Sequence, residues 1–337
     1  MITFTPTPYR ADGSIALGSA LQIVGILGLL GILLGVIFGY ISRYFYLILL
    51  FPIVIGGCIG AAGSMCITRF HIRNPLLCGF AGFFAGCLAM FTIQYTGYRI
   101  FEKNLVVSLG EEGLAVREIA LRREQIRADW ENATEDEKAV IQELETNPEG
   151  LRALRTNNVW RYMDLMAHHG VEINNGGGRG GINLGHTGSY LYWAVETLIV
   201  AGLAYSLMSK AAAAPYCNDC GQWKQAQLYG PFIGAPEVAR AVGEGTLARF
   251  SNDPQTGTPE AMVTLFTCPE CQQEGTADVL VEKWTTNRKG ETAKKRLVQM
   301  TYPGASIPVL ETICTPDTPA TETNEAGARA AAASSPA

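Results

Sequence analysis

The stretch that decides the fold is LGSALQIVGILGLLGILLGVIFGYIS, residues Leu17–Ser42, which contains no Asp, Glu, Lys, Arg or His. Two further apolar stretches follow it, Tyr44–Ile67 and Pro75–Tyr98. Each exceeds the roughly 20 residues that cross a ~30 Å hydrocarbon core as a helix. A fourth, Tyr190–Ser209, is just long enough and begins with aromatic residues typical of a membrane interface. The sequence therefore predicts four transmembrane helices.

Two of these stretches have alternative interpretations. The fourth contains Glu196 and has minimal length, so a buried helix of a soluble domain is its alternative. A cleaved signal peptide fits the first stretch poorly, because only Arg10 precedes it and the apolar run far exceeds the usual 7 to 15 residues.

The composition agrees with a membrane protein that also has soluble parts. Of the 337 residues, 48% are apolar and only 17% are charged, and the net charge is −5. Average soluble domains carry about a quarter charged residues. The deficit is local, because residues 1–98 hold four Lys or Arg, one Asp and no Glu. Collagen, a disulfide scaffold and wholesale disorder are excluded by the apolar content and by only nine cysteines in so long a chain.

Glycine recurs at intervals of four in the first three predicted spans. Residues four apart share a helix face, and small residues there let two helix backbones approach closely in lipid. This glycine-zipper pattern predicts tight helix packing, either within one chain or between chains. The residues concerned are Gly31, Gly35 and Gly39, then Gly56 and Gly60, then Gly82 and Gly86.

Glu196 is the single carboxylate within the predicted spans. A charge near the centre of a span costs on the order of 3 kcal/mol, so an intramembrane acid is a candidate functional residue for a proton or cation. The alternative is structural: Glu196 lies near the headgroups, or is neutral and bonded to Gln22 or Gln94 of another helix. The sequence leaves both interpretations open.

The orientation follows from the distribution of positive charge. With four spans, both termini and the short Thr68–Asn74 loop lie on one side. That side carries Arg10, Arg69 and Arg73 in short segments, against Arg43 alone on the other side. We therefore expect both termini in the cytoplasm. The Ala- and Gly-rich composition suggests the cytoplasmic membrane of a bacterium.

Residues 99–173 predict a small soluble helical domain. A helix is expected over Glu111–Trp130, a second begins at Thr134 with a capping box, and a third opens at Asn147 and ends at Gly170. His168 and His169 are adjacent, and are expected on the surface rather than as a metal pair. Residues 174–189 form a Gly-rich linker into the fourth span.

Two Cys-x-x-Cys pairs follow the last span, Cys217 with Cys220 and Cys268 with Cys271. Each spacing lets both sulfurs of a tight turn face one point, and two such turns supply four soft ligands for Zn²⁺. Four ligands leave no open position, so the ion would be structural. Iron fits four thiolates too, and thiol–disulfide exchange is a further alternative. Thiolates need a reducing compartment, which agrees with a cytoplasmic C-terminus.

The segment from Cys217 to about Tyr302 resembles a zinc ribbon with an insertion. The resemblance rests on the paired cysteines and on β-prone runs beside them, and it implies no family-wide activity. Strands are expected at Met262–Phe266, Ala277–Thr285 and Thr292–Tyr302, the last returning across Asn287–Gly290.

A basic cluster lies near this expected hairpin. Cys217 is the eighth residue after Ser209, a distance of at most roughly 28 Å, so the ribbon must lie near the membrane. The cluster could then contact anionic lipid headgroups, whereas nucleic acid is possible but not favoured. A solvated strand face is the alternative. The five residues are Arg288, Lys289, Lys294, Lys295 and Arg296.

These observations predict an α-helical polytopic membrane protein with a small helical loop domain and a C-terminal β-rich zinc ribbon. The expected divisions are 1–16, an N-terminal segment; 17–98, three spans; 99–173, the loop domain; 174–189, the linker; 190–209, the fourth span; 210–314, the ribbon; and 315–337, a disordered tail.

The expected function is a membrane scaffold or adaptor whose ribbon binds a partner protein. The alternative is an oligomeric channel or transporter component that uses Glu196. Membrane lipids and a protein partner or a second copy of the chain are the expected contacts. An enzyme is disfavoured because the sequence lacks GxSxG, HExxH and nucleotide-binding fingerprints.

Overall fold

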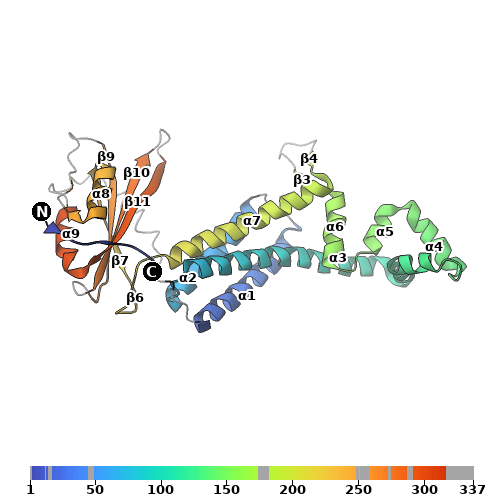
Figure 1. Ribbon diagram of the computed structural model, residues 1–337. Helices are drawn as coiled ribbons and strands as arrows, with labels where there is room; N and C mark the ends of the chain where they lie inside the picture. Colours follow the sequence, from blue (N-terminus) through green and yellow to red (C-terminus); the bar gives the residue numbers. More distant parts are fainter. Residues whose placement is uncertain are drawn as a thin grey trace. The chain divides into compact units, whose positions relative to one another are not determined.

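The computed structural model describes residues 2–11, 13, 17–44, 49–173, 182–247, 250, 258–271, 275–286 and 291–315. The chain forms two compact units (Figure 1). One comprises Gly13–Ala213 and is helical, whereas the other comprises Met1–Asp12 together with Ala214–Ala337 and contains the main sheet.

Four helices of the first unit are long and apolar enough to cross a membrane, as the sequence predicts. The third is the longest, with 54 residues, and it continues well beyond the predicted end at Tyr98. Its helical dihedral angles are interrupted at Gly110, where φ is 64° and ψ is −169°. An apolar first part therefore leads directly into a charged helix of the loop domain. The four helices are α1 (Leu17–Ile41), α2 (Leu50–Phe70), α3 (Pro75–Ala128) and α7 (Gly185–Ala212).

Glycines lie where these helices approach one another within the chain. A Cβ added at Gly35 of α1 would lie 2.6 Å from the backbone oxygen of Ala89 in α3. A Cβ added at Gly86 of α3 would lie 2.8 Å from the Cα of Ala201 in α7. Larger side chains at either glycine would separate the helices, so these positions require close backbone packing.

The predicted helix starts at Thr134 and Asn147 are confirmed, whereas Glu111 lies within α3, one residue after the interruption at Gly110. In α4 (Glu135–Thr146), the Thr134 hydroxyl accepts a hydrogen bond from the Glu137 amide at 3.3 Å. The Glu137 carboxylate accepts a hydrogen bond from the Thr134 amide at 3.1 Å, which completes the capping box. At the start of α5 (Pro148–Leu154), the side chain of Asn147 accepts a hydrogen bond from the Gly150 amide at 2.9 Å.

The prediction of one third helix through to Gly170 is wrong, because the segment is divided. A separate helix, α6 (Val159–His169), begins after Asn158. The Asn158 side chain accepts a hydrogen bond from the Arg161 amide at 3.0 Å. This cap starts a new helix inside a continuous apolar pattern, since Asn hydrogen-bonds backbone amides better than it continues a helix.

The connection from α6 to α7 contains a short strand pair. Strand β3 (Glu172–Ile173) pairs antiparallel with β4 (Ile182–Asn183), and α7 begins at Gly185 rather than at Tyr190. Residues 174–181 of the predicted linker lie outside the described residues.

The second unit is built on a five-stranded antiparallel sheet in the order β2-β11-β10-β9-β7. The three predicted strands are present as β9, β10 and β11; β9 has nine residues where five were predicted, and the other two are one or two residues longer than predicted. The turn at residues 287–290 and the tail at 316–337 lie outside the described residues. The strands are β2 (Thr7–Pro8), β7 (Gln225–Ile233), β9 (Pro259–Thr267), β10 (Thr276–Thr286) and β11 (Thr292–Pro303).

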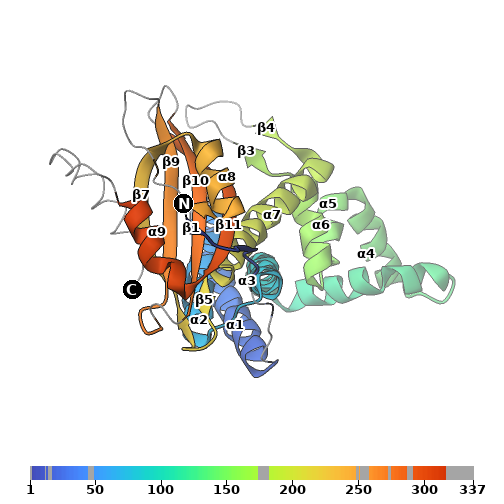
Figure 2. The same cartoon turned by 60° about the vertical axis from the view of Figure 1, so that its left-hand side comes forward.

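Two helices, α8 (Ala235–Glu244) and α9 (Ile307–Cys314), pack on one face of this sheet (Figure 2). A short 3₁₀ turn, Gly304–Ser306, leads into α9. The enclosed core includes the fully buried Tyr302, whose hydroxyl donates to the Val242 carbonyl. Two further pairs complete the unit: β1 (Ile2–Thr3) with β8 (Thr246–Leu247), and β5 (Tyr216–Cys217) with β6 (Gln222–Trp223).

Candidate metal centre and the pocket around Glu196

The four paired cysteines lie in two turns of the sheet unit. Strands β5 and β6 form a hairpin whose turn carries Cys220, and the second pair follows the end of β9. Gly221 closes the first turn with φ +68°, and its amide donates to the Cys217 carbonyl at 3.0 Å. That left-handed conformation is readily available to glycine, so the sequence suits the turn.

The structure brings all four thiols together, as the spacing predicts. The four sulfur atoms all lie within 4.8 Å of one another. The Cys271 sulfur is 3.4 Å from that of Cys217 and 2.7 Å from that of Cys220. A tetrahedral zinc site with Zn–S distances of about 2.3 Å separates its sulfurs by about 3.8 Å, so changes on the order of 1 Å would admit the ion.

The surroundings of the cluster affect how its thiols ionise. Burial raises the pKa of Cys268, but backbone amides of Cys271 and Glu270 donate to its sulfur and leave its pKa lowered overall. The hydrogen bond with Cys220 instead raises the pKa of Cys271. Four neighbouring thiolates repel one another, and a soft divalent cation would remove that repulsion. The donor set fits zinc, and iron by the same chemistry.

Two further contacts connect these turns to each other and to the sheet. The Gln222 amide donates to the Glu270 carboxylate at 2.6 Å across the two turns. One residue after β6, the Lys224 ammonium contacts the Asp278 carboxylate of β10 at 2.7 Å, and both side chains are 2% exposed. The position of the first turn is thereby fixed against the central strands.

The basic cluster is only partly placed. Lys294, Lys295 and Arg296 are exposed on β11, whereas Arg288 and Lys289 lie outside the described residues. Arg296 lies opposite Glu282 in the strand register, and the Lys294 ammonium is 4.0 Å from the ring centroid of Trp284. Two of these cations therefore lie next to side chains of β10: Arg296 next to the acidic Glu282, and Lys294 next to the aromatic Trp284.

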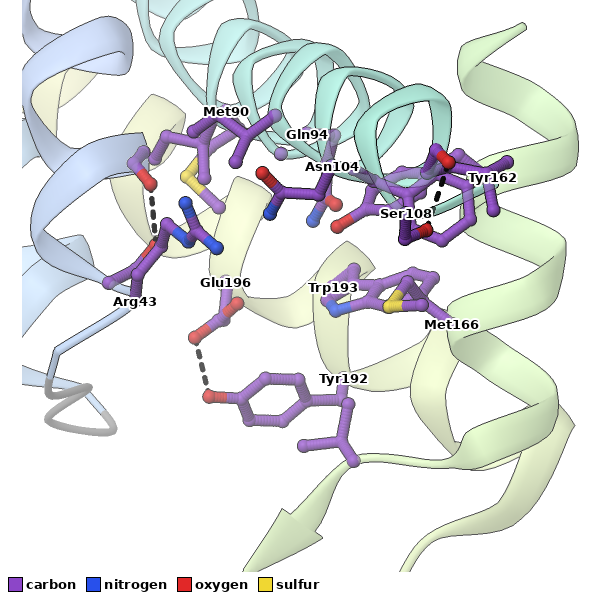
Figure 3. A pocket seen from close by; sticks show the side chains of 18 residues that line it. Arg43, Met90, Gln94, Asn104, Ser108, Tyr162, Met166, Tyr192, Trp193 and Glu196 are labelled. Carbon is purple, nitrogen blue, oxygen red and sulfur yellow. Dashed lines mark hydrogen bonds between the residues drawn. The ribbon is translucent and has the colours of Figure 1, made fainter. Parts of the chain in front are cut away.

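Glu196 lies beside a cavity of about 680 Å³ within the helical unit (Figure 3). Its side chain is buried, with 4% of the residue exposed, and its carboxylate accepts a hydrogen bond from the Tyr192 hydroxyl at 2.5 Å. Tyr192 precedes Glu196 by one helical turn, so α7 presents both groups on one face.

The cavity is lined by α1, α3, α6 and α7, and by residues that join them. Gln94, one of the two glutamines suggested as partners of Glu196, is part of this lining. Burial raises the pKa of Tyr162 on α6, and the positive charge of Arg43 partly lowers it, which places that charge near the tyrosine. The other polar lining side chains include Ser42, Asn104 and Ser108.

Most of this polar lining could not be found from the apolar spans. Asn104 and Ser108 belong to the continuation of α3 beyond its predicted span, and Tyr162 belongs to the loop domain. Arg43 follows α1. The sequence signals were the position of Glu196 in an apolar span and the presence of Gln94, its suggested partner, in another span.

A second group of possible metal ligands was missed. Asp164 and His168 of α6 lie with His186 of α7 so that one ligand atom from each is within 4.8 Å of the others. His169, the neighbour of His168 in the sequence, points elsewhere on the helix. The useful signal was the i, i+4 spacing from Asp164 to His168.

Comparison of this chain with protein-family models, with curated proteins and with solved structures finds no match in any of the three.

Proposed function

We propose that this protein is an integral-membrane scaffold whose C-terminal unit, organised by a structural zinc ion, binds an extended segment of a partner protein. The observation that carries the proposal is the convergence of four cysteine sulfurs from two distant turns. A closed set of four thiolates is typical of structural zinc, because no coordination position remains for water or substrate. Zinc binding would then stabilise the fold of the unit.

The zinc ion would act on the strand at the edge of the sheet. Strand β7 begins at Gln225, directly after the β5–β6 turn and Lys224, so an ion that fixes the turn also fixes the start of β7. Among the described residues, β7 pairs only with β9 and leaves its other edge available. An available edge strand can accept a further strand through main-chain hydrogen bonds.

The side chains of β7 support this role. Its first four residues, Gln225 to Leu228, are all exposed, and Leu228 is 53% exposed. An exposed leucine among uncharged residues gives an added strand an apolar contact without a charge to desolvate. Pro231 follows and cannot donate a main-chain hydrogen bond, so pairing would be confined to the first half of the strand.

The test is affinity capture of the full-length protein from solubilised membranes, with three variants. Leu228→Lys and the double variant Cys217→Ser with Cys268→Ser should each lose the same stoichiometric partner. Ala293→Lys, which adds the same charge on the exposed part of β11, should retain it. Binding of that partner by Leu228→Lys at the wild-type level would refute the edge-strand proposal.

The metal is measured separately. Purified wild-type protein should contain one equivalent of zinc more than the double cysteine variant. Equal metal contents would contradict a structural ion at the four cysteines, whatever happens to the partner. Iron in place of zinc would retain the structural role and correct the metal.

A second candidate function rests on the cavity around Glu196. A channel or transporter component needs a polar pathway, and the spans alone supply few polar groups. The cavity adds Arg43, Asn104 and Tyr162 to Glu196 and Gln94, so one chain assembles a polar site of about 680 Å³. Of these groups Glu196 is buried, Gln94 and Tyr162 are half-buried, and Arg43 and Asn104 are exposed. A buried carboxylate beside a cavity in a membrane helix unit typically marks a ligand or ion site.

The transport function is tested by measuring ion or solute flux through vesicles that contain the protein. Glu196→Gln retains the shape of the side chain and removes its charge, so ion or solute flux through sealed vesicles should change at least several-fold. Glu135→Gln, an exposed change in the first turn of α4, is the control. Equal flux in all three proteins would exclude a transport role for Glu196.

A further inference from the structure

A carboxylate and two imidazoles from two helices meet at the corner between α6 and α7. The Nε2 atom of His186 lies 3.0 Å from Oδ1 of Asp164, and Nδ1 of His168 lies 3.6 Å from Oδ2 of the same carboxylate. We propose that Asp164, His168 and His186 bind a divalent transition-metal ion, with zinc as the ion this donor set fits best. Imidazole and carboxylate are usual zinc ligands.

The local sequence explains why the groups converge. Asp164 and His168 are four residues apart on α6, so their side chains lie on one face of that helix. His186 is the second residue of α7 and approaches the same face from a different element. Ligands from two elements restrict the geometry more than a pair on one helix does.

The corner itself is held by hydrogen bonds that do not involve residues 174–181. The Asn183 side chain donates to the His169 carbonyl at 2.9 Å and accepts the Gly185 amide at 2.8 Å, so it joins the end of α6 to the start of α7. The Val171 amide donates to the Ser189 hydroxyl at 3.0 Å. The α7 imidazole is therefore positioned relative to α6 before any ion binds, which lowers the entropic cost of binding.

The contacts around the two imidazoles suit metal ligation. The Nδ1 atom of His168 also lies 2.9 Å from the Asp164 carbonyl oxygen, a contact that limits the rotation of this ring. The ring of His186 packs edge-on against Tyr190, with centroids 5.2 Å apart, which also limits its rotation.

Electrostatics favour a shared cation. The two imidazole rings have centroids 4.3 Å apart and share one carboxylate. Two protonated rings at this distance would repel each other, whereas two neutral rings can both donate a lone pair to one ion. Tetrahedral N and O ligands lie about 3.4 Å apart, and the partly exposed side chains can adjust to that from their present separations.

Three protein ligands leave a fourth coordination position for water or an external group, unlike the four-cysteine cluster. The site also joins two walls of the Glu196 cavity, because α6 carries Tyr162 and α7 carries Trp193. A bound ion would therefore fix one wall of that cavity against the other.

The test compares zinc content of the full-length protein, purified in detergent and equilibrated with free Zn²⁺. Wild type should hold one equivalent more than Asp164→Asn, His168→Ala or His186→Ala. His169→Ala, on the same helix one residue away, should match wild type. The difference between wild type and variant does not depend on whether the cysteine cluster holds metal.

Cobalt gives a second measurement. With added Co²⁺, the difference spectrum of wild type minus Asp164→Asn should show visible d–d bands without the near-ultraviolet sulfur-to-cobalt band, because the cysteine cluster contributes equally to both, and Asp164→Asn should weaken binding at this site at least about tenfold. Asp164 is an exposed side chain, so this variant is expected to fold even if a histidine variant does not. Equal zinc content and equal cobalt binding in wild type and Asp164→Asn would overturn the proposal, as would equal loss in His169→Ala.

Discussion

At the scale of single residues, the buried ion pair of Lys224 and Asp278 in the sheet unit carries a large desolvation cost. Both side chains are 2% exposed, so two charges have lost their hydration. Hydrogen bonds offset part of that cost: the Lys224 ammonium donates to the Thr276 hydroxyl at 2.8 Å, and the Thr301 hydroxyl donates to Asp278 at 2.5 Å. A buried pair is tolerated when its remaining polar atoms are satisfied in this way.

Removing one partner should therefore cost much more than removing both. Asp278→Ala leaves a buried ammonium without its counter-charge and should lower the unfolding free energy by about 3 to 5 kcal/mol. The double variant Lys224→Met with Asp278→Leu should recover most of that loss. Thermal melting followed by near-ultraviolet circular dichroism is the measurement.

A surface pair in the same sheet provides the control for that prediction. Lys283 and Glu260 are 2.9 Å apart and partly exposed, so Glu260→Gln should change the unfolding free energy by no more than about 1 kcal/mol. A loss for Asp278→Ala as small as that for Glu260→Gln would mean that the pair is hydrated in solution.

Cys314, at the end of α9, gives the sheet unit a defined response to alkali. It is 1% exposed in the core, and burial raises its pKa to about 12. A pKa raised above the unfolded value of about 8.5 contributes stability below that pH, and the contribution is lost as pH rises toward 12. Cys314→Val removes this titration. The fall in melting temperature between pH 7.5 and pH 10.5 should be smaller in Cys314→Val than in wild type, and an equal fall would contradict the assignment.

At the scale of elements, the packing of α1 depends on which face each glycine occupies. A Cβ at Gly35 would lie 2.6 Å from the Ala89 backbone oxygen, whereas a Cβ at Gly25 of the same helix meets nothing within 4 Å. Gly35→Ala should therefore cost about 1 to 3 kcal/mol through overpacking. Gly25→Ala should be neutral or slightly stabilising, because alanine favours a helix.

Melting curves of the two glycine variants in one detergent test this contrast directly. The comparison holds residue type, helix and substitution constant, so only the neighbouring helix differs. Equal melting temperatures for Gly35→Ala and Gly25→Ala would show that α1 does not pack against α3 in solution.

Local signals explain which elements could be predicted. The spans follow from unbroken apolar length. The start of α4 follows from Thr134 and Glu137, which are three positions apart and whose side chains bind each other's backbone amides. The division of the third loop helix was missed because Asn158 caps a helix inside an apolar pattern that continues across it. The spacing of apolar residues shows which face of a helix is buried. It does not show whether one helix continues or a second helix begins.

The same limit applies to the candidate sites. Both cysteine pairs carry their spacing in the sequence, so their convergence could be predicted. His186 could not be joined to Asp164 and His168, because the contact depends on how α7 meets α6. The lining of the Glu196 cavity likewise comes from separate elements, and no local pattern marks it.

At the scale of the whole molecule, the two ends of the chain belong to one unit. Strand β2 pairs with β11, as Pro8 with Met300 and Thr7 with Thr301. The Tyr9 hydroxyl also donates to the Ala214 carbonyl at 3.3 Å, which joins the residues before α1 to those after α7. This pairing had no sequence signal, because a two-residue strand pairs with a partner near the other end of the chain.

That pairing restricts the membrane topology that we propose for the four apolar helices. A segment before the first span can join a sheet after the last span only if both lie on the same side. The number of crossings must then be even, in agreement with the four helices that are long enough. We propose, from the arginine distribution and the thiol cluster, that this side is the cytoplasm.

Labelling of single positions in intact cells tests the arrangement. Cysteines placed at the exposed Thr5 and Thr312 should both resist a membrane-impermeant thiol reagent, and one placed at Glu135 on α4 should react. The background chain keeps its metal cysteines, because the comparison is made against the unmodified protein. Reaction at Thr5 without reaction at Thr312 would require an odd number of crossings and would break the β2–β11 pairing. Reaction at both, with Glu135 protected, would keep the even number and reverse the orientation, which would place the thiol cluster in an oxidising compartment and count against structural zinc.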